Sequence, residues 1–99
     1  IGRIAFKFIN SKEKITKEQE KRIYHLYLHW CAKEAIYKIC DKEGISIKKD
    51  ITIEPFDVKE SGEIRGSVKT KTINDSFDLF YTRYDNYTIV WTKKNYDKG

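Results

Sequence analysis

The spacing of hydrophobic positions changes along the chain, and each change predicts a different element. Residues 3–9 alternate between apolar and polar side chains, which predicts a half-buried β-strand. From residue 17 to residue 43 the apolar positions recur at helical spacing, and no glycine or proline interrupts them. The sequence therefore predicts a short strand followed by one long helix.

Local signals mark both ends of this helix. Residues 16–19 match a capping box, in which the hydroxyl of Thr16 accepts a hydrogen bond from the amide of Gln19. Gly44 is well placed to end the helix in the left-handed conformation. At 1.5 Å per residue, a helix over 17–43 would be about 40 Å long.

Such a helix carries more apolar surface than one sheet can cover. The stripe that its spacing directs to the core comprises Tyr24, Leu28, Cys31, Ala35 and Ile39, with Ala32 beside it. A second apolar group, roughly 150° around the helix, comprises Ile23, Leu26, Trp30 and Tyr37. We expect this second group to be covered by the chain's own sheet, by a partner chain or by a ligand. It is the candidate partner-binding surface.

After Gly44 the pattern changes to short β-type runs. We expect strand segments at 45–47 and 51–53 and a longer strand at 63–73. Turn-forming residues at 61–62 and 74–76 separate the later strands.

The end of the chain predicts a β-hairpin. A two-residue Asp-Asn turn at 85–86 tolerates positive φ. The resulting register pairs Tyr84 with Tyr87, Thr82 with Ile89, Phe80 with Trp91 and Asp78 with Lys93. We expect the face of Phe80 and Trp91 to meet the helix, because it is the more apolar face. The reverse face is mixed and carries Phe77, Leu79, Tyr81 and Arg83, with Thr88, Val90, Thr92 and Lys94 on the facing strand.

These elements predict a single α+β domain over residues 1–99. One long N-terminal helix would pack on an antiparallel sheet of four or five strands, in the order β-α-β-β-β-β. This element order resembles the cystatin-like and NTF2-like groups of folds. The resemblance is one of element order only, and it implies a docking module within a larger assembly. Because the chain opens with Ile1 and not with methionine, we expect a fragment of a longer chain or a processed product.

The charge of the chain is moderately basic. Its 99 residues carry a net charge of +5, with acidic and basic residues interspersed, and a basic surface favours polyanionic partners. Basic and aromatic residues on the mixed sheet face suit single-stranded nucleic acid, through phosphate pairing and base stacking. This alternative surface comprises Arg65, Lys69, Lys71, Phe77, Tyr81, Arg83 and Lys94. The other interpretation is a solvated sheet face whose lysine stems shield aromatic edges.

His25 and His29 are four residues apart, the spacing at which one helix face offers two imidazoles to a metal. A zinc site needs at least one more ligand, so we expect two ordinary boundary histidines, no metal site and no cofactor. Alternatively, either histidine could be the general base of a small ribonuclease of the toxin type, with Arg65, Lys69 or Arg83 holding the phosphate. Nothing in the sequence brings these groups together, so no catalytic residue is assigned.

The two cysteines and the hydropathy give weaker indications. Cys31 and Cys40 would lie on opposite sides of the helix and about 13.5 Å apart along its axis, which is too far for a disulfide. Reduced cysteines are compatible with the cytoplasm, but they leave the compartment undetermined. No run of 18 apolar residues occurs, so we expect no membrane span.

The leading hypothesis is a non-enzymatic interaction module that binds a protein partner or self-associates through Ile23, Leu26, Trp30 and Tyr37. The alternative is a basic nucleic-acid-binding domain, or a small ribonuclease-type toxin, that uses the sheet face.

Overall fold

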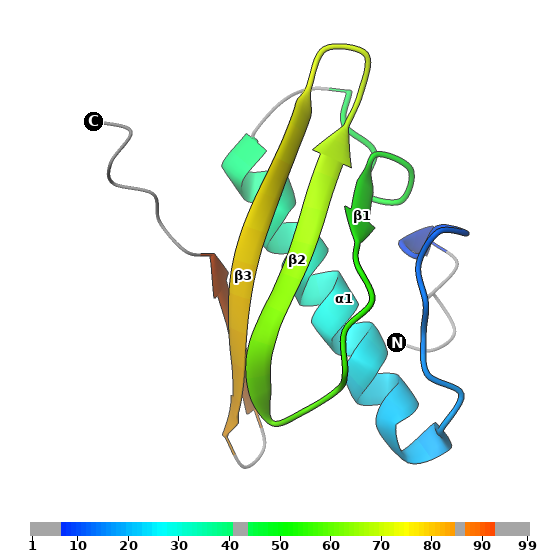
Figure 1. Cartoon of the computed structure of the whole chain (residues 1–99), viewed down its shortest axis with the longest axis vertical. Helices are drawn as coiled ribbons and strands as arrows, with labels where there is room; N and C mark the ends of the chain where they lie inside the picture. Colours follow the sequence, from blue (N-terminus) through cyan, green and yellow to red (C-terminus); the bar gives the residue numbers. More distant parts are fainter. Residues whose placement is uncertain (1–6, 41–43, 85–86, 93–99) are drawn as a thin grey trace.

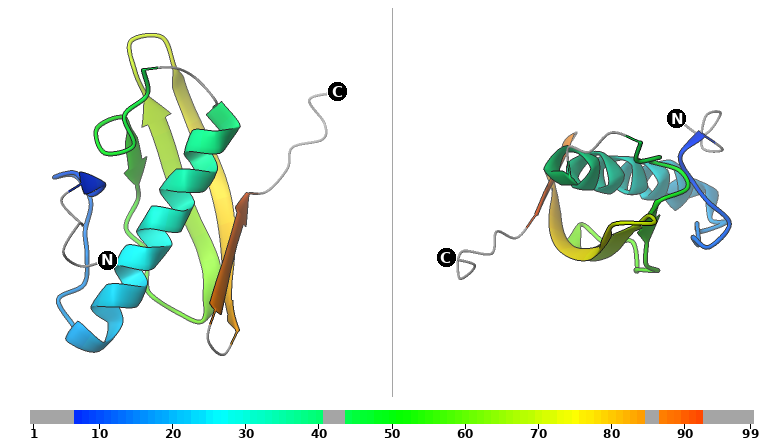
Figure 2. Two further views of the ribbon diagram at one scale, coloured as in Figure 1. Left: turned by 180° about the vertical axis from the view of Figure 1, so that it is seen from behind. Right: turned by 90° about the horizontal axis from the view of Figure 1, so that it is seen from above.

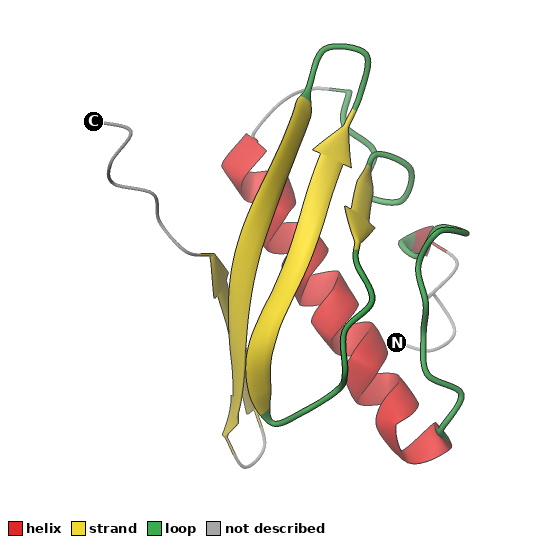
Figure 3. Ribbon diagram, in the orientation of Figure 1, coloured by secondary structure: helices red, strands yellow, loops and turns green. Residues whose placement is uncertain are grey.

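A computed structural model describes residues 7–40, 44–84 and 87–92. Within them, one helix, α1 (Gln19–Cys40), packs on a four-stranded antiparallel sheet (Figure 1). The predicted α+β class, with a long helix on an antiparallel sheet, is therefore confirmed. The predicted first strand at 3–9 is not observed as such, because residues 3–6 lie outside the described residues and residues 7–9 form no strand. Figure 3 shows the segment that precedes α1 as loop with one short helical turn.

The sheet consists of β1 (Ile51–Ile53), β2 (Ser61–Lys69), β3 (Asn74–Tyr84) and β4 (Tyr87–Thr92), in spatial order β1-β2-β3-β4. The predicted hairpin register is confirmed: Tyr84 pairs with Tyr87, Thr82 with Ile89, and Phe80 with Trp91. The predicted pair of Asp78 with Lys93 falls outside the described residues. Seen along the molecule, the sheet curls around one side of α1 (Figure 2).

Three local predictions about the strands were wrong. Residues 45–47 form no strand, because hydrogen bonds between Ser46 and Asp50 fold this segment into a turn. Residues 61–62 and 74–76 are paired within strands and are not turns. The connection between β2 and β3 lies at Thr70–Ile73, where the Thr70 hydroxyl accepts hydrogen bonds from two backbone amides.

The helix begins two residues later than predicted. The hydroxyl of Thr16 accepts from the amide of Glu18 (3.2 Å), and the first helical hydrogen bond runs from the Arg22 amide to the Glu18 carbonyl (2.8 Å). At the other end Gly44 has φ +85°, the left-handed conformation that glycine adopts without steric strain. Residues 41–43 lie outside the described residues.

The core lies between α1 and the concave face of the sheet. Its fully buried helix residues are Leu28, Ala32 and Ile36. The predicted core stripe is therefore shifted, and Ile39 is about half exposed (48%). Gly66 marks the closest approach, since a Cβ there would lie 2.6 Å from the Cδ1 atom of Ile36. A side chain at this position would push the helix away from β2.

The hairpin meets the helix with the face opposite to the one predicted. Leu79 and Tyr81 are buried under α1, whereas Trp91 is 45% exposed on the outer side of the sheet. The reason is the pairing with β2, which places Leu79 directly opposite the buried Ile64. Directly paired residues of neighbouring strands share one face of a sheet. The pairing with the apolar face of β2 therefore determines which face of the hairpin packs against α1.

The second apolar group on α1 is partly covered by the chain itself. Leu26 is fully buried, and the ring of Trp30 packs edge-on against Phe8 from the N-terminal segment (5.4 Å between ring centres). In Figure 2 this segment lies along the side of α1 opposite to β4. Ile23 and Tyr37 stay exposed, at 53% and 37% of their surface.

Candidate active site

Glu13 is a buried carboxylate that ties three parts of the fold together. One of its oxygens accepts from the Lys33 ammonium (2.7 Å) and from the amide of Asn10 (2.9 Å), and the other accepts from the amide of Ile53 on β1 (2.8 Å). The Lys33 ammonium also donates to the carbonyl oxygen of Phe8. This Glu13–Lys33 pair therefore fixes the N-terminal segment against both α1 and the edge of the sheet.

Burial and hydrogen bonding act in opposite directions on this pair. Burial alone would raise the pKa of Glu13, but the nearby His29 ring (3.4 Å) and hydrogen bonds from Lys33 and backbone amides outweigh it, and the pKa lies below its usual value. Burial lowers the pKa of Lys33, and the attraction to Glu13 opposes this effect. Because both side chains are fully buried, each charge depends on the other for compensation.

His25 and His29 are buried beside the Glu13–Lys33 pair. Their ring centres are 5.0 Å apart, and Phe56 contacts both rings. The Nδ1 atom of His25 accepts from the amide of Thr16 (3.1 Å), which leaves its proton on Nε2. Within residues 7–40, 44–84 and 87–92, no group of three or more His, Cys, Asp or Glu residues could hold a metal ion.

We predict that the free energy of unfolding falls as the pH is lowered from 6.5 to 4. Burial, followed by the neighbouring His29, lowers the pKa of His25 to about 4. In the unfolded chain His25 takes up a proton near pH 6.5, whereas in the native state it does so only near pH 4. The free energy of unfolding should therefore fall by on the order of 3 kcal/mol. Glu13, whose pKa is also lowered, contributes a further loss below pH 4.5. Urea titrations at four pH values would measure this slope. His25→Gln should flatten it above pH 4.5, and an unchanged slope in that variant would contradict the assignment.

The proposed nucleic-acid surface does not exist as one face. Arg65 and Lys69 are exposed on the outer side of β2, whereas Phe77 and Tyr81 face the helix. Tyr81 is buried and its hydroxyl bonds to the backbone of Asp57 and Lys59. Arg83 lies over the ring of Tyr24 on α1, and Lys71 is in the β2–β3 connection. Lys94 falls outside the described residues. Arg65 itself is paired with Asp78 (2.8 Å) and lies 3.6 Å from Glu54.

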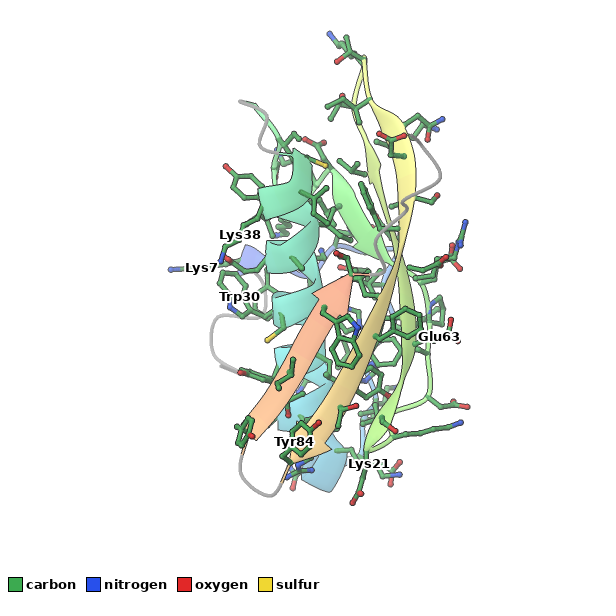
Figure 4. The ribbon with its side chains drawn as sticks, turned by 90° about the vertical axis from the view of Figure 1, so that its left-hand side faces the viewer. Lys7, Lys21, Trp30, Lys38, Glu63 and Tyr84 are labelled. Carbon is green, nitrogen blue, oxygen red and sulfur yellow. The ribbon has the colours of Figure 1, made fainter. Side chains whose placement is uncertain are left out.

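The exposed side of α1 presents a different set of charges. Trp30, Glu34 and Lys38 follow one another at four-residue intervals, so they lie along one face of the helix. The Glu34 carboxylate is 3.9 Å from the Lys38 ammonium, and 34% and 78% of their side-chain surfaces are exposed. Lys7 is also exposed and is the chain neighbour of Phe8, which packs on Trp30. In Figure 4, Lys7, Trp30 and Lys38 project to the same side of the molecule, away from the sheet. We call Lys7, Trp30, Glu34 and Lys38 the outer helix face.

A pocket of about 390 Å³ lies elsewhere, between the start of α1 and the segment that follows β1. Its walls include His25, Phe56 and Asp57, with Lys14 and Lys21 beside them. His25 precedes Glu34 by nine residues, which places the two on opposite sides of the helix. The pocket is thus separate from the outer helix face.

The outer helix face thus combines two exposed lysines, one of them on the N-terminal segment, with a carboxylate and an aromatic ring. Such groups suit a phosphorylated substrate that binds a metal ion. A comparison with protein families identifies the class of enzyme. The model of the 4'-phosphopantetheinyl transferase superfamily matches residues 2–95, and the chain belongs to this superfamily. No curated protein and no solved structure matches the chain.

This membership corrects the functional hypothesis. The non-enzymatic interaction module was wrong, because the superfamily is one of group-transfer enzymes. The nucleic-acid-binding and ribonuclease alternatives have no support either. Glu34 and Lys38 gave no distinctive signal in the sequence, because a Glu-Lys pair at this spacing is also an ordinary surface ion pair. Glu13 and Lys33 are separated by twenty residues, and only the fold brings them together.

Two further expectations concern binding. The superfamily typically acts on carrier proteins, which agrees with a protein partner. No helix among the described residues has the length and apolar character to cross a membrane.

Cys31 and Cys40 are both half-buried, and neither takes part in a disulfide in the described part of the chain.

Proposed function

We propose that this chain transfers a 4'-phosphopantetheinyl group to a hydroxyl of a carrier protein. The observation that carries this proposal is the family match, which extends over residues 2–95. The superfamily name specifies the group that moves, and its usual acceptors are carrier proteins. The outer helix face is the surface that we propose for the reaction.

The chemistry is a phosphoryl-type transfer. The donor carries phosphopantetheine through a phosphoanhydride bond, as in coenzyme A. The acceptor oxygen attacks the phosphorus, a new phosphorus–oxygen ester bond forms, and the anhydride bond breaks. The nucleotide phosphate leaves with the electron pair, and the hydroxyl proton passes to a base or to solvent. The transferred group accumulates negative charge on its oxygens, which cations must stabilise.

The outer helix face supplies the groups that this reaction needs. Most of the Lys38 side chain is exposed, so a bound phosphate can contact its ammonium, and Lys7 is exposed on the same side. Mg²⁺ is usually held by one or two carboxylates together with substrate phosphates. Glu34 is a carboxylate of this kind, and a metal bound there would draw charge from the phosphate oxygens. The net charge of +5 favours an anionic donor in addition.

The buried Glu13–Lys33 pair supports this surface from below. Lys33 holds the carbonyl of Phe8, Phe8 packs on Trp30, and Trp30 precedes Glu34 by one helical turn. The outer helix face is therefore supported by the N-terminal segment, whose position is fixed by the buried Glu13–Lys33 pair. Such support is what holds reacting groups in one geometry.

Ile23, Trp30 and Tyr37 are the part of the predicted partner-binding surface that a carrier protein could contact. They are exposed or half exposed on the same side of α1 as Glu34. Leu26 is fully buried and cannot take part, because the fold already covers it. Large apolar side chains next to a reactive site are typical contacts for a protein substrate.

The experiment is a transfer assay with coenzyme A, Mg²⁺ and a set of unmodified carrier proteins. We expect the acceptor mass to rise by one phosphopantetheinyl group, and the acceptor whose target serine is replaced by alanine should remain unmodified. Isothermal titration with coenzyme A gives a second readout that does not depend on the choice of acceptor. A folded chain that neither binds coenzyme A nor modifies any acceptor would contradict the proposal.

A further inference from the structure

Strand β4 forms an open edge of the sheet. Among the described residues it pairs with β3 alone, and its sequence, Tyr87–Thr92, contains no charged residue, no proline and no glycine. Its outward side chains are exposed: Tyr87 at 58%, Ile89 at 43% and Trp91 at 45%. Natural proteins usually protect such an edge with charge, proline or a bulge.

The opposite edge of the same sheet shows how this chain protects a strand. β1 is three residues long, and side chains from the N-terminal segment occupy its free backbone groups. The Asn10 amide donates to the carbonyl of Ile51 (3.3 Å), and the Glu13 carboxylate accepts from the amide of Ile53 (2.8 Å). The edge of β1 is therefore closed, whereas no described residue closes that of β4.

The register identifies the backbone groups that β4 leaves unpaired. Tyr84 and Tyr87 flank a two-residue connection, so they form a hydrogen-bonded pair, and bonding positions then alternate along the strand. Thr88 and Val90 consequently direct their N–H and C=O groups away from β3. No backbone hydrogen bond from residues 7–40, 44–84 or 87–92 outside the strand reaches these groups. An extended backbone is the partner that satisfies a row of such donors and acceptors.

We propose that β4 pairs antiparallel with β4 of a second copy of this chain, forming a two-fold symmetric dimer with a continuous sheet. A two-fold axis through Ile89 places this residue against its own copy. It also sets Tyr87 opposite Trp91 of the second copy, which forms an aromatic cross-strand pair on the outer face. Thr88 then lies opposite Val90 of the second copy, so that the unpaired backbone groups meet one another. The strand is thus complementary to itself, as a two-fold interface requires.

The exposed aromatic side chains on the outer face of the sheet are not confined to β4, because β3 carries others beside them. The Phe80 and Trp91 rings are 6.1 Å apart, and the Tyr84 and Tyr87 rings are stacked at 5.4 Å. In the dimer these aromatic pairs from the two copies form one apolar band across the joined sheets. A single strand edge buries less surface than a standard interface, so we expect a dissociation constant of about 100 µM. This dimer does not depend on the transferase activity.

Sedimentation velocity over a concentration series tests the dimer. Between about 10 µM and about 1 mM, the weight-average mass should rise from the 11.8 kDa of one chain towards twice that value. Hydrogen exchange at the two ends of this range gives an independent readout. The amides of Thr88 and Val90 should exchange several-fold more slowly at high concentration, whereas those of Tyr87 and Ile89 should not change.

Ile89→Lys places two like charges across the axis and should keep the protein monomeric throughout the series. Ser76→Lys is the matched control, since it adds one charge on the same outer face of the sheet, six residues along β3 from the Thr82 that pairs with Ile89, and should dimerise as the unmodified chain does. Thermal melting confirms that both variants fold. A constant mass of one chain would overturn the proposal, and so would dimerisation of Ile89→Lys or a mass increase without slower exchange at Thr88 and Val90.

Discussion

Replacing Lys33 by methionine is expected to lower the free energy of unfolding by about 3–5 kcal/mol. The change leaves the Glu13 carboxylate buried and without its cation, and it also removes the hydrogen bond to the carbonyl of Phe8. The loss of a buried partner is far more damaging than the loss of a surface pair, because the remaining charge cannot return to water. Chemical denaturation at pH 7 measures the effect.

The control for this prediction is a double variant. Glu13→Gln combined with Lys33→Met removes both charges, so it should recover a large part of the stability that either single change loses. Lys21→Met serves as a matched surface control, because Lys21 is 53% exposed and should change stability by no more than about 0.5 kcal/mol. If the double variant were as unstable as the sum of the two single variants, the pair would not be coupled as the structure indicates.

The second large effect concerns the reaction. Glu34→Gln is expected to lower kcat/KM for transfer by about 100-fold or more, since the loss of one charged group at a reacting phosphate is of that order. Glu34 is partly exposed and its contact with Lys38 is a surface ion pair, so the melting temperature should hardly change. The readouts are therefore the rate of acceptor modification and the Mg²⁺ concentration at half-maximal rate.

Glu63→Gln is the matched control for this variant. Glu63 is also exposed, but it lies on the sheet side of the molecule, away from the outer helix face (Figure 4). Its replacement should leave the rate unchanged. Equal rates for the Glu34 and Glu63 variants would show that the reaction does not take place at the outer helix face. The transfer assay on the unmodified chain would still decide whether the protein is a transferase.

The stability and activity predictions are linked through Phe8. Because Lys33 fixes this residue and Phe8 supports Trp30, a chain that keeps its fold but loses the Glu13–Lys33 pair should have a less ordered outer helix face. Near-ultraviolet circular dichroism of the double variant would report this if Trp91 is first replaced by phenylalanine, so that Trp30 is the one remaining tryptophan. The physical basis is that side chains on a surface are ordered by what lies beneath them.

The sequence by itself determined the features that depend on near neighbours. The 3.6-residue period predicted α1, and the two-residue turn predicted the pairs Tyr84–Tyr87 and Phe80–Trp91. These features follow from backbone geometry over a few residues, so the amino acids within each segment are sufficient to specify them.

Only the tertiary structure decided which surfaces would be hidden. The period of a strand shows which residues share a face, but the face that meets the helix was chosen by the pairing of Leu79 with Ile64 on another strand. In the same way, Phe8 met Trp30 and Glu13 met Lys33 because the N-terminal segment folds back along α1. Contacts between distant segments depend on how whole elements pack, and the sequence around a single residue does not specify that packing.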